Sequence, residues 1–259
     1  MAKSFWKGVI SFGLVAIPVK MYVTTETRPL SFHLLHKKCL TRPKQVLHCD
    51  IDNEYFSIKD TLRGYEVSKD QYVVLDESDF EKVPIKTSHS IDIQCFIDST
   101  EIDPVYYYGS HYIEPEELGV KPFQLLRQAL EKTGKVGIAK VAFQHREHLG
   151  CLRPLDNIMA LHTIHFQSEI LPQEEFTPAE TKTTAAEMDM AISLIKAMAK
   201  GFKPEDYRDD YQEALKKLVE AKVKGEKIVV PSVAKVEMAD LMQALRASVE
   251  AVGKSKIKT

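Results

Sequence analysis

Cysteine and histidine are the side chains of this sequence best suited to metal binding or nucleophilic chemistry. Nine residues separate Cys39 from Cys49, and His48 directly precedes Cys49. A structural zinc site normally draws its ligands from two closely spaced pairs, such as C-x-x-C. The position that would complete such a pair after Cys49 is Asp52. We therefore expect the four cysteines to be free or buried and no metal to be bound, with a zinc site as the alternative.

The histidines form two further pairs, His145 with His148 and His162 with His165. Each pair has the spacing i, i+3, which on a strand points the two side chains to opposite faces. One pair alone therefore cannot hold a metal, and the alternative is a site that combines both pairs across two strands. The corresponding enzyme hypothesis is a metal-dependent hydrolase that uses these histidines, or the cysteines with His48.

Nucleotide-binding and acyl-transfer motifs are absent from the sequence. It contains no G-x-x-x-x-G-K-[ST] loop, no G-x-G-x-x-G turn and no G-x-S-x-G elbow. We therefore assign no catalytic residue and no cofactor, and we expect that the protein is not an enzyme.

The basic residues are distributed unevenly along the chain. The formal net charge of the 259 residues is −2, which by itself argues against a nucleic-acid partner. The stretch from Arg28 to Cys49 nevertheless holds five basic residues and no acidic one, so it carries +5 and the remainder carries −7. The basic residues of this stretch are Arg28, Lys37, Lys38, Arg42 and Lys44. One interpretation is a solvated loop that opposes the acidic block after it, and the other is an element that contacts phosphates.

An N-terminal region made mainly of strands must position these residues. Apolar and polar residues alternate over 91–97, which is typical of a half-buried strand. Further segments rich in β-branched or aromatic residues are 5–23, 72–75, 105–113, 136–143, 149–153 and 158–166. Asp76 has the character of a helix cap, and one longer helix is predicted from Pro122 to Gly134. Its predicted buried stripe consists of Leu125, Leu126, Ala129 and Leu130. Many short strands around one helix predict a β-barrel or a strongly curved sheet.

The composition changes after Pro172, where helical periodicity replaces strand patterns. Helices are predicted over 185–200, with Met188, Ala191, Ile192, Ile195 and Met198 on one face, and over 206–224. After a linker that contains Pro231, four further apolar residues have the spacing of a short amphipathic helix: Met238, Leu241, Met242 and Leu245. A helix this short is marginal alone, so it either folds back on the body or docks into a groove of a partner.

The overall composition is that of an ordinary globular chain. Hydrophobic residues make up 44% and charged residues 28%, which excludes a fully disordered or collagen-like chain. No apolar run approaches the roughly 18 residues that span a bilayer, and the N-terminus does not resemble a signal peptide. We therefore expect one or two domains, no membrane partner and a cytoplasmic location.

Several segments, in order along the chain, resemble one known family. They include Ser4-Phe5-Trp6-Lys7-Gly8, Ser31-Phe32-His33-Leu34-Leu35-His36, Gly64-Tyr65-Glu66, Glu101-Ile102-Asp103-Pro104-Val105-Tyr106-Tyr107, His145-Arg146-Glu147-His148-Leu149, Tyr211-Gln212-Glu213-Ala214-Leu215 and Asp240-Leu241-Met242-Gln243-Ala244-Leu245. Each match is weak alone, but the ordered set is specific and covers nearly the whole chain. The sequence resembles the bacterial Ku proteins.

The resemblance implies a mixed α/β, mainly β fold with a Ku-type barrel. It implies a β-barrel core with a strand-built DNA bridge over 1–173, a helical arm over 174–225, a linker over 226–234, and a C-terminal amphipathic helix with a short basic tail over 235–259. It also implies a homodimeric ring that binds double-stranded DNA ends independently of sequence. That ring would recruit and stimulate the ATP-dependent DNA ligase of non-homologous end joining, in association with the nucleoid.

The resemblance also suggests roles for individual residues. Lys37, Lys38, Arg42 and Lys44 lie where the bridge begins and are expected to contact DNA, with Arg28 adjacent. Arg146 and Arg153 lie in family-like motifs, where they either face DNA or stabilise the barrel. Met238, Leu241, Met242 and Leu245 are expected to insert into a groove of the ligase. A purely structural dimer with a ligand-free barrel is the third hypothesis.

Overall fold

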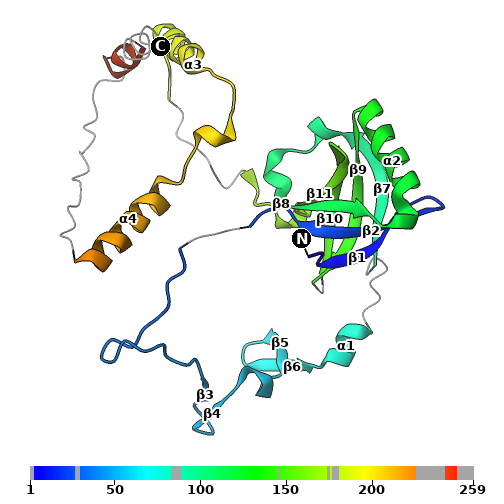
Figure 1. Cartoon of the computed structure of the whole chain (residues 1–259), viewed down its shortest axis with the longest axis vertical. Coiled ribbons are helices and arrows are strands. Elements are labelled where there is room, and N and C mark those ends of the chain that lie inside the picture. The colour runs from blue at the N-terminus through cyan, green and yellow to red at the C-terminus, as the bar shows by residue number, and fades with distance from the viewer. Residues whose placement is uncertain are drawn as a thin grey trace. The chain divides into compact units, whose positions relative to one another are not determined.

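The computed structural model of the chain describes residues 3–26, 30–82, 89–144, 146–173, 176, 181–225 and 243–249. The chain divides into two units, Met1–Arg28 with His33–Pro172, and Pro29–Phe32 with Gln173–Thr259. Figure 1 colours the chain by residue number, from blue at the N-terminus to red at the C-terminus, so the residues of each unit can be found from the colour bar. Within the described ranges, no helix is long and apolar enough to cross a membrane.

Seven strands close into a barrel in the order β1-β2-β8-β11-β10-β9-β7 (Figure 1). Their bounds are Trp6–Phe12 for β1, Val15–Val23 for β2, Ser90–Asp98 for β7, Tyr107–Pro115 for β8, Lys135–Phe143 for β9, Arg146–Leu155 for β10 and Ile158–Ile164 for β11. Six of the seven neighbouring pairs are antiparallel, whereas β1 and β7 are parallel. Closure leaves this sheet without a free edge, and the predicted β-barrel is confirmed.

The side chains of the barrel strands follow the two-residue period of the backbone. In β2, Ile17, Val19 and Met21 are buried, while Pro18 and Lys20 between them are half-buried. Each apolar residue of this alternation points to the core, so the register of the strand is fixed.

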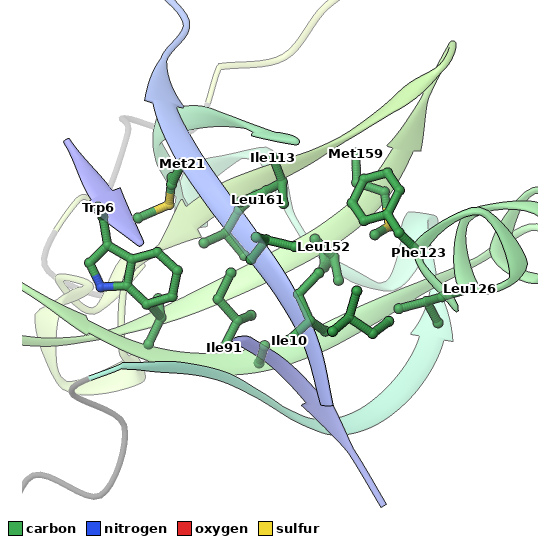
Figure 2. Packing of buried hydrophobic residues seen from close by; sticks show 14 of the residues in the cluster. Trp6, Ile10, Met21, Ile91, Ile113, Phe123, Leu126, Leu152, Met159 and Leu161 are labelled. Carbon is green, nitrogen blue, oxygen red and sulfur yellow. The ribbon is translucent and has the colours of Figure 1, made fainter. Parts of the chain in front are cut away.

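The barrel core is completed by one helix. Helix α2 (Val120–Thr133) contributes Phe123, Leu126 and Leu130 to the core cluster, and Figure 2 shows Phe123 beside Met159 of β11. The helix ends at Gly134, whose φ of 68° is the left-handed conformation that glycine adopts readily. The predicted stripe was partly wrong, because Leu125 is 70% exposed and Ala129 is also exposed, whereas Phe123 is buried. The large aromatic ring of Phe123 fills the space between the helix and the strands. The buried face of α2 is therefore rotated about the helix axis, away from Leu125.

Between β2 and β7 the chain leaves the barrel and forms two small antiparallel sheets. One pairs β3 (Leu47–Cys49) with β4 (Glu54–Phe56), and the other pairs β5 (Arg63–Ser68) with β6 (Gln71–Leu75). The 3₁₀ turn η1 (Ile58–Asp60) follows β4, and helix α1 (Glu77–Glu81) follows β6. No residue from 30 to 82 whose exposure is described is buried.

Local capping begins helix α1 where the sequence predicts it. The Asp76 side chain accepts a hydrogen bond from the backbone N–H of Asp79, and the Asp79 carboxylate accepts one from the N–H of Asp76. This reciprocal arrangement satisfies two backbone donors that the helix itself cannot pair. The predicted strand over 72–75 and the predicted cap are both confirmed.

In its described residues, the C-terminal unit contains two longer helices. Helix α3 (Ala185–Met198) begins with a capping box between Thr184 and Glu187. Helix α4 (Asp210–Lys224) is capped by the Asp209 side chain and ends at Gly225, whose φ is 72°. Residues 243–249 are also helical. Both predicted helices are confirmed, although α4 begins later than expected because Pro204–Asp206 forms a separate 3₁₀ turn.

The face of α3 that is half-buried differs from the predicted one. Met190, Leu194 and Ala197 are half-buried, whereas Ile192 and Ile195 of the predicted stripe are exposed. Apolar residues lie on both sides of this helix, so periodicity alone does not distinguish the covered side from the open one.

Several histidines pack among the aromatic side chains of the barrel. The rings of His148 and Phe143 are stacked with centroids 4.0 Å apart, and His148 Nδ1 lies 2.6 Å from the hydroxyl of Tyr108. The ring of His111 lies 5.2 Å from that of Phe5 and 5.4 Å from that of Phe143, between centroids. The buried Nδ1 of His111 has no hydrogen-bond partner among the described residues.

Burial governs the protonation of these histidines. His162 is half-buried, and its Nδ1 lies 2.8 Å from the hydroxyl of Ser110. Desolvation is the largest cause that lowers the pKa of His111, His148 and His162. The neutral imidazoles therefore serve as packing groups of the barrel.

This protonation predicts that the barrel loses stability in mild acid. The unfolded chain protonates its histidines near pH 6.5, whereas the folded barrel binds those protons only at lower pH. The stabilisation is therefore complete above about pH 6.5 and is lost as the pH falls through the folded-state pKa values. The urea midpoint is expected to fall between about pH 7.5 and 5.5, and His111→Leu is expected to reduce that fall.

The matched control is His33→Ala, which alters an exposed histidine outside the barrel. It should leave the pH dependence of the urea midpoint as in the unmodified protein. An unmodified protein with equal midpoints at both pH values would contradict the assignment.

Candidate nucleic-acid interface

Four of the basic residues singled out from the sequence lie in a segment without helix or strand, residues 30–46, here called the basic segment. Lys37, Lys38, Arg42 and Lys44 are all exposed. Within the described ranges, none of these four forms an ion pair with an acidic side chain. Their positive charge is therefore available to an anionic partner.

A tight turn organises the first part of the basic segment. The backbone N–H of His36 donates to the carbonyl of Thr41 at 2.8 Å, and the N–H of Leu40 donates to the carbonyl of His36 at 2.7 Å. Leu40 adopts a φ of 55°, which reverses the chain. The turn places Lys37, Lys38 and Cys39 together in one short loop.

The thiol of Cys39 is held within this turn. Its Sγ lies 3.0 Å from Thr41 Oγ1 and 3.0 Å from His36 Nδ1. Hydrogen bonds from the Thr41 side chain and backbone, followed by that from His36, lower the pKa of Cys39 to about 7. The turn therefore stabilises a thiolate beside the two lysines.

The other predicted DNA-binding residues have different surroundings. Arg28 lies outside the described residues. Arg146 begins β10 and forms an ion pair with Glu169, whose carboxyl pKa is lowered first by the backbone N–H of Phe166 and then by Arg146. Arg153 is exposed on β10 and lines a cavity of about 200 Å³. Arg146 is thus engaged within the barrel unit, and a DNA contact by either arginine remains a prediction.

The cysteines and histidines near position 49 make local hydrogen bonds. His48 Nδ1 lies 3.0 Å from Asp50 Oδ1 and His48 Nε2 lies 3.2 Å from Asn53 Oδ1. Cys49 Sγ donates to Asp52 Oδ2 at 3.4 Å. Among the described residues, no three His, Cys, Asp or Glu side chains gather in a way that could hold a metal ion.

Exposed apolar side chains on the β5–β6 hairpin are a feature that the sequence interpretation missed. Tyr65 and Val73 are directly opposite each other across the two strands and are 66% and 48% exposed. On the other face, Tyr72 and Val74 are 59% and 54% exposed. Consecutive apolar residues at 72–74 place apolar side chains on both faces of a strand, and this was the available signal. An uncovered two-stranded sheet of this kind is marginally stable by itself.

The residues predicted to bind a partner lie near the C-terminus. Met238, Leu241 and Met242 lie outside the described residues. Leu245 belongs to the helical residues 243–249 and is half-buried, as is Val249 one turn later. Their role therefore remains a prediction.

Comparison with known proteins gives a consistent result over the length of the chain. Residues 11–190 match the family model described as Ku: Ku70/Ku80 beta-barrel domain. A non-homologous end joining protein Ku of Desulfitobacterium hafniense is 42% identical over 97% of this chain and 88% of its own. The protein of the same name from Archaeoglobus fulgidus is 41% identical over 96% of this chain and 99% of its own.

A third relative, from Solibacter usitatus and also named non-homologous end joining protein Ku, is 38% identical over 100% of this chain and 97% of its own. The match to the family model includes β2, β7 and β8 to β11 of the barrel together with the basic segment. The resemblance seen in the sequence is thereby confirmed, and the chain belongs to the Ku family.

Proposed function

We propose that the protein binds the ends of double-stranded DNA irrespective of sequence, as a homodimer, in double-strand break repair by non-homologous end joining. Its membership of the Ku family supports this role. The observation that carries the proposal in this chain is the set of exposed cations in the basic segment, which form no ion pair with any acidic side chain that the structure describes. The protein would act at the chromosome, in association with the nucleoid.

Electrostatics supply the affinity in this proposal. Lys37, Lys38, Arg42 and Lys44 neutralise phosphates and release condensed counterions, which is independent of base sequence. With Arg28 the stretch carries +5, and a twofold dimer presents it twice. Binding of this kind consumes no nucleotide, so the protein needs no catalytic residue. The acidic remainder of the chain disfavours DNA elsewhere on the surface.

The geometry of a closed ring supplies the preference for ends. A ring that encloses a duplex can load only where the duplex stops, whereas an open basic surface binds linear and circular DNA alike. This distinction separates the end-binding proposal from a dimer with a purely structural role.

The exposed hairpin supports a second copy of this chain as the partner in the dimer. Tyr65 and Val73 present an apolar pair to solvent, and Tyr72 and Val74 present another on the opposite face. Burial of apolar side chains contributes roughly 25 cal/mol per Å², and aromatic residues are enriched at interfaces. We infer that the β5–β6 hairpin is covered by the partner subunit.

The C-terminal residues are proposed to recruit the end-joining ATP-dependent ligase. Met238, Leu241, Met242 and Leu245 share one face of an amphipathic helix by their spacing. An amphipathic helix beyond a linker can lay its apolar face into a groove of a partner. Supporting this, the segment from 226 to 234 contains Pro231 and separates the helix from α4.

End binding predicts a difference between linear and circular duplexes of equal length and sequence. In gel-shift titrations at two salt concentrations, linear duplexes are expected to bind more tightly at both. Higher salt is expected to weaken both complexes, because counterion release drives them. Equal affinity for linear and circular DNA would instead favour the structural-dimer hypothesis.

The phosphate role of the turn predicts the effect of the double variant Lys37→Glu, Lys38→Glu. A dimer loses four phosphate contacts, so the slope of log K against log salt, which is negative, is expected to become shallower by about 4. The loss of affinity should be similar for duplexes of different sequence, because no base is contacted. Fluorescence anisotropy across a salt series measures both quantities.

The matched control is Lys121→Glu, Lys132→Glu, which makes the same change of charge at two exposed positions of α2. Its salt slope is expected to remain near that of the unmodified protein. A loss confined to particular sequences in the first variant would contradict the phosphate role.

The dimer proposal predicts that Tyr65→Asp with Val73→Asp yields a monomer. Each substitution places a charge where the partner would bury an apolar side chain, which is costly without an ion-pair partner. Light scattering after size-exclusion chromatography reports the mass. Leu118→Asp alters a residue of the 3₁₀ turn between β8 and α2 that is 92% exposed, and this variant should retain the dimer. A dimeric mass for the hairpin variant would show that another surface pairs the subunits.

The recruitment proposal predicts that removal of Met238–Thr259 separates two activities. End binding is expected to persist, because the basic segment is intact, whereas stimulation of the ligase is expected to be lost. A ligation assay with linear DNA, run beside the gel shift, measures both. Stimulation that survives the truncation would place the ligase contact elsewhere.

A further inference from the structure

The inner face of the barrel carries a row of small residues across four neighbouring strands. Thr163 of β11 is paired with Gly109 of β8 on one side and with Gly150 of β10 on the other, and Gly150 is paired in turn with Ala139 of β9. Thr163 lies two residues after Leu161, a member of the core cluster drawn in Figure 2, so the row faces the core. Small residues leave interior volume that other groups must fill.

The space beside the two glycines of this row is bordered differently. A Cβ at Gly150 would lie 2.8 Å from Cδ1 of Leu161, so an apolar side chain covers that glycine. A Cβ at Gly109 would lie 2.5 Å from Thr163 Oγ1 and 3.9 Å from Thr163 Cβ. Apart from the chain neighbours of Gly109, no other described residue has a heavy atom within 4 Å of that point. The space beside Gly109 therefore borders on a hydroxyl and not on an apolar group.

The hydroxyl of Thr163 points into this space without a hydrogen-bond partner. Its oxygen is nearer than its Cβ to the Cβ position of Gly109, which defines the direction. Thr163 is only 1% exposed, and Oγ1 has no partner among the described residues. Burial of an unpaired hydroxyl is unfavourable, because the unfolded chain bonds it to water. The row of small residues thus includes a polar group that requires a partner.

A second unpaired polar atom belongs to the same face of β8. His111 lies two residues after Gly109 and is paired with Leu161, and its buried Nδ1 has no partner among the described residues. Two residues of a strand rise roughly 6.6 Å, a distance comparable to two consecutive hydrogen bonds of roughly 2.8 Å each. Desolvation by burial lowers the pKa of His111, so the imidazole is neutral and Nδ1 needs one donor or one acceptor.

We propose that the barrel binds one water molecule beside Gly109, where the water forms hydrogen bonds with Thr163 Oγ1 and His111 Nδ1. Buried waters in proteins pair polar groups that have no other partner, and they need at least two such groups. Water both donates and accepts, so it matches either tautomer of the neutral imidazole and either orientation of the hydroxyl. The site is independent of DNA binding, because it lies inside the barrel.

The bound water links two strands at an irregular point of the sheet. The register of β8 and β11 shifts between Thr163 and Ile164, which interrupts the ladder of backbone hydrogen bonds there. A bridge from Thr163 to His111 connects the same two strands through their side chains. The water therefore supports the pairing where the backbone alone supports it least.

Thr163→Val distinguishes a bound water from an unsatisfied hydroxyl by the sign of its effect on stability. Valine keeps the shape of threonine and removes the oxygen. With the water in place, the variant loses a hydrogen bond and leaves His111 Nδ1 unpaired, so the melting temperature measured by circular dichroism is expected to fall by several degrees. A raised or unchanged melting temperature would overturn the inference. The control Thr100→Val, at an exposed position, is expected to melt as the unmodified protein does.

Oxygen-17 magnetic relaxation dispersion counts the waters that the protein holds for long times. Its amplitude is expected to fall by one water per chain in Thr163→Val and in Gly109→Ala, whose added Cβ would occupy the space beside Thr163 Oγ1. The control Gly201→Ala, where a Cβ meets no described heavy atom within 4 Å, should keep the full amplitude. Thr163→Val adds no atoms, so it provides the test by itself if Gly109→Ala does not fold. An unchanged amplitude in either folded variant contradicts the water site.

A double-variant cycle tests whether the same water contacts both side chains. Melting temperatures are compared for Thr163→Val, His111→Leu and the combination of the two. If one water serves both groups, either substitution releases it, so the combined fall is expected to be smaller than the sum of the separate falls. The changed packing of His111 against Phe5 and Phe143 cancels in the cycle. A combined fall equal to the sum would overturn the bridge.

Discussion

The parallel pairing of β1 with β7 is the contact on which the rest of the structure depends. Val9, Ile10 and Ser11 lie beside Ser90, Ile91 and Asp92, and the N–H of Val9 donates to the carbonyl of His89 at 2.9 Å. Gly8 permits this approach, because a Cβ at that position would lie 2.3 Å from the same carbonyl oxygen. This seam closes the barrel around its core and gives β1 and β7 their second neighbours, so each of the seven barrel strands is paired on both sides.

The seam also holds both ends of the chain between β2 and β7. Residues 30–82 have no buried core of their own, and their small sheets gain little from local packing. The barrel supplies the buried apolar core that stabilises the fold, whereas the described residues of the connecting chain keep their charged and apolar side chains at the surface. The proposed DNA contacts and the proposed subunit contacts both lie in this connecting chain.

Much of the barrel could be predicted from local pattern, because strands that line a core repeat every two residues. The cap at Asp76 forms as predicted, and the alternation over 91–97 predicted the strand β7, although an irregularity between Ile93 and Cys95 leaves Cys95 exposed. The closure of the sheet by β1 and β7 could not be predicted, since it joins residues far apart in the sequence. The buried face of α2 was shifted because the volume of Phe123, not the density of leucines, decides which side faces the core. For α3, apolar residues on both faces left the choice to tertiary contacts.

The candidate site shows a similar division. The charge of a segment can be counted directly from its residues, so the basic stretch was evident from the sequence although the net charge of the whole chain is −2. The bonding of Cys39 to His36 and Thr41 depends on a left-handed backbone at Leu40, for which the sequence carries no glycine as a signal. The exposure of Tyr65 and Val73 depends on whether another element packs against the hairpin, and the periodicity of a strand does not predict that.

The seam has a further consequence for the integrity of the molecule. The strands β1 and β2 precede the basic segment in the sequence and pair with β7 and β8, which follow it. The two sides of the basic segment are therefore joined twice, once through the backbone and once through the hydrogen bonds of the barrel sheet.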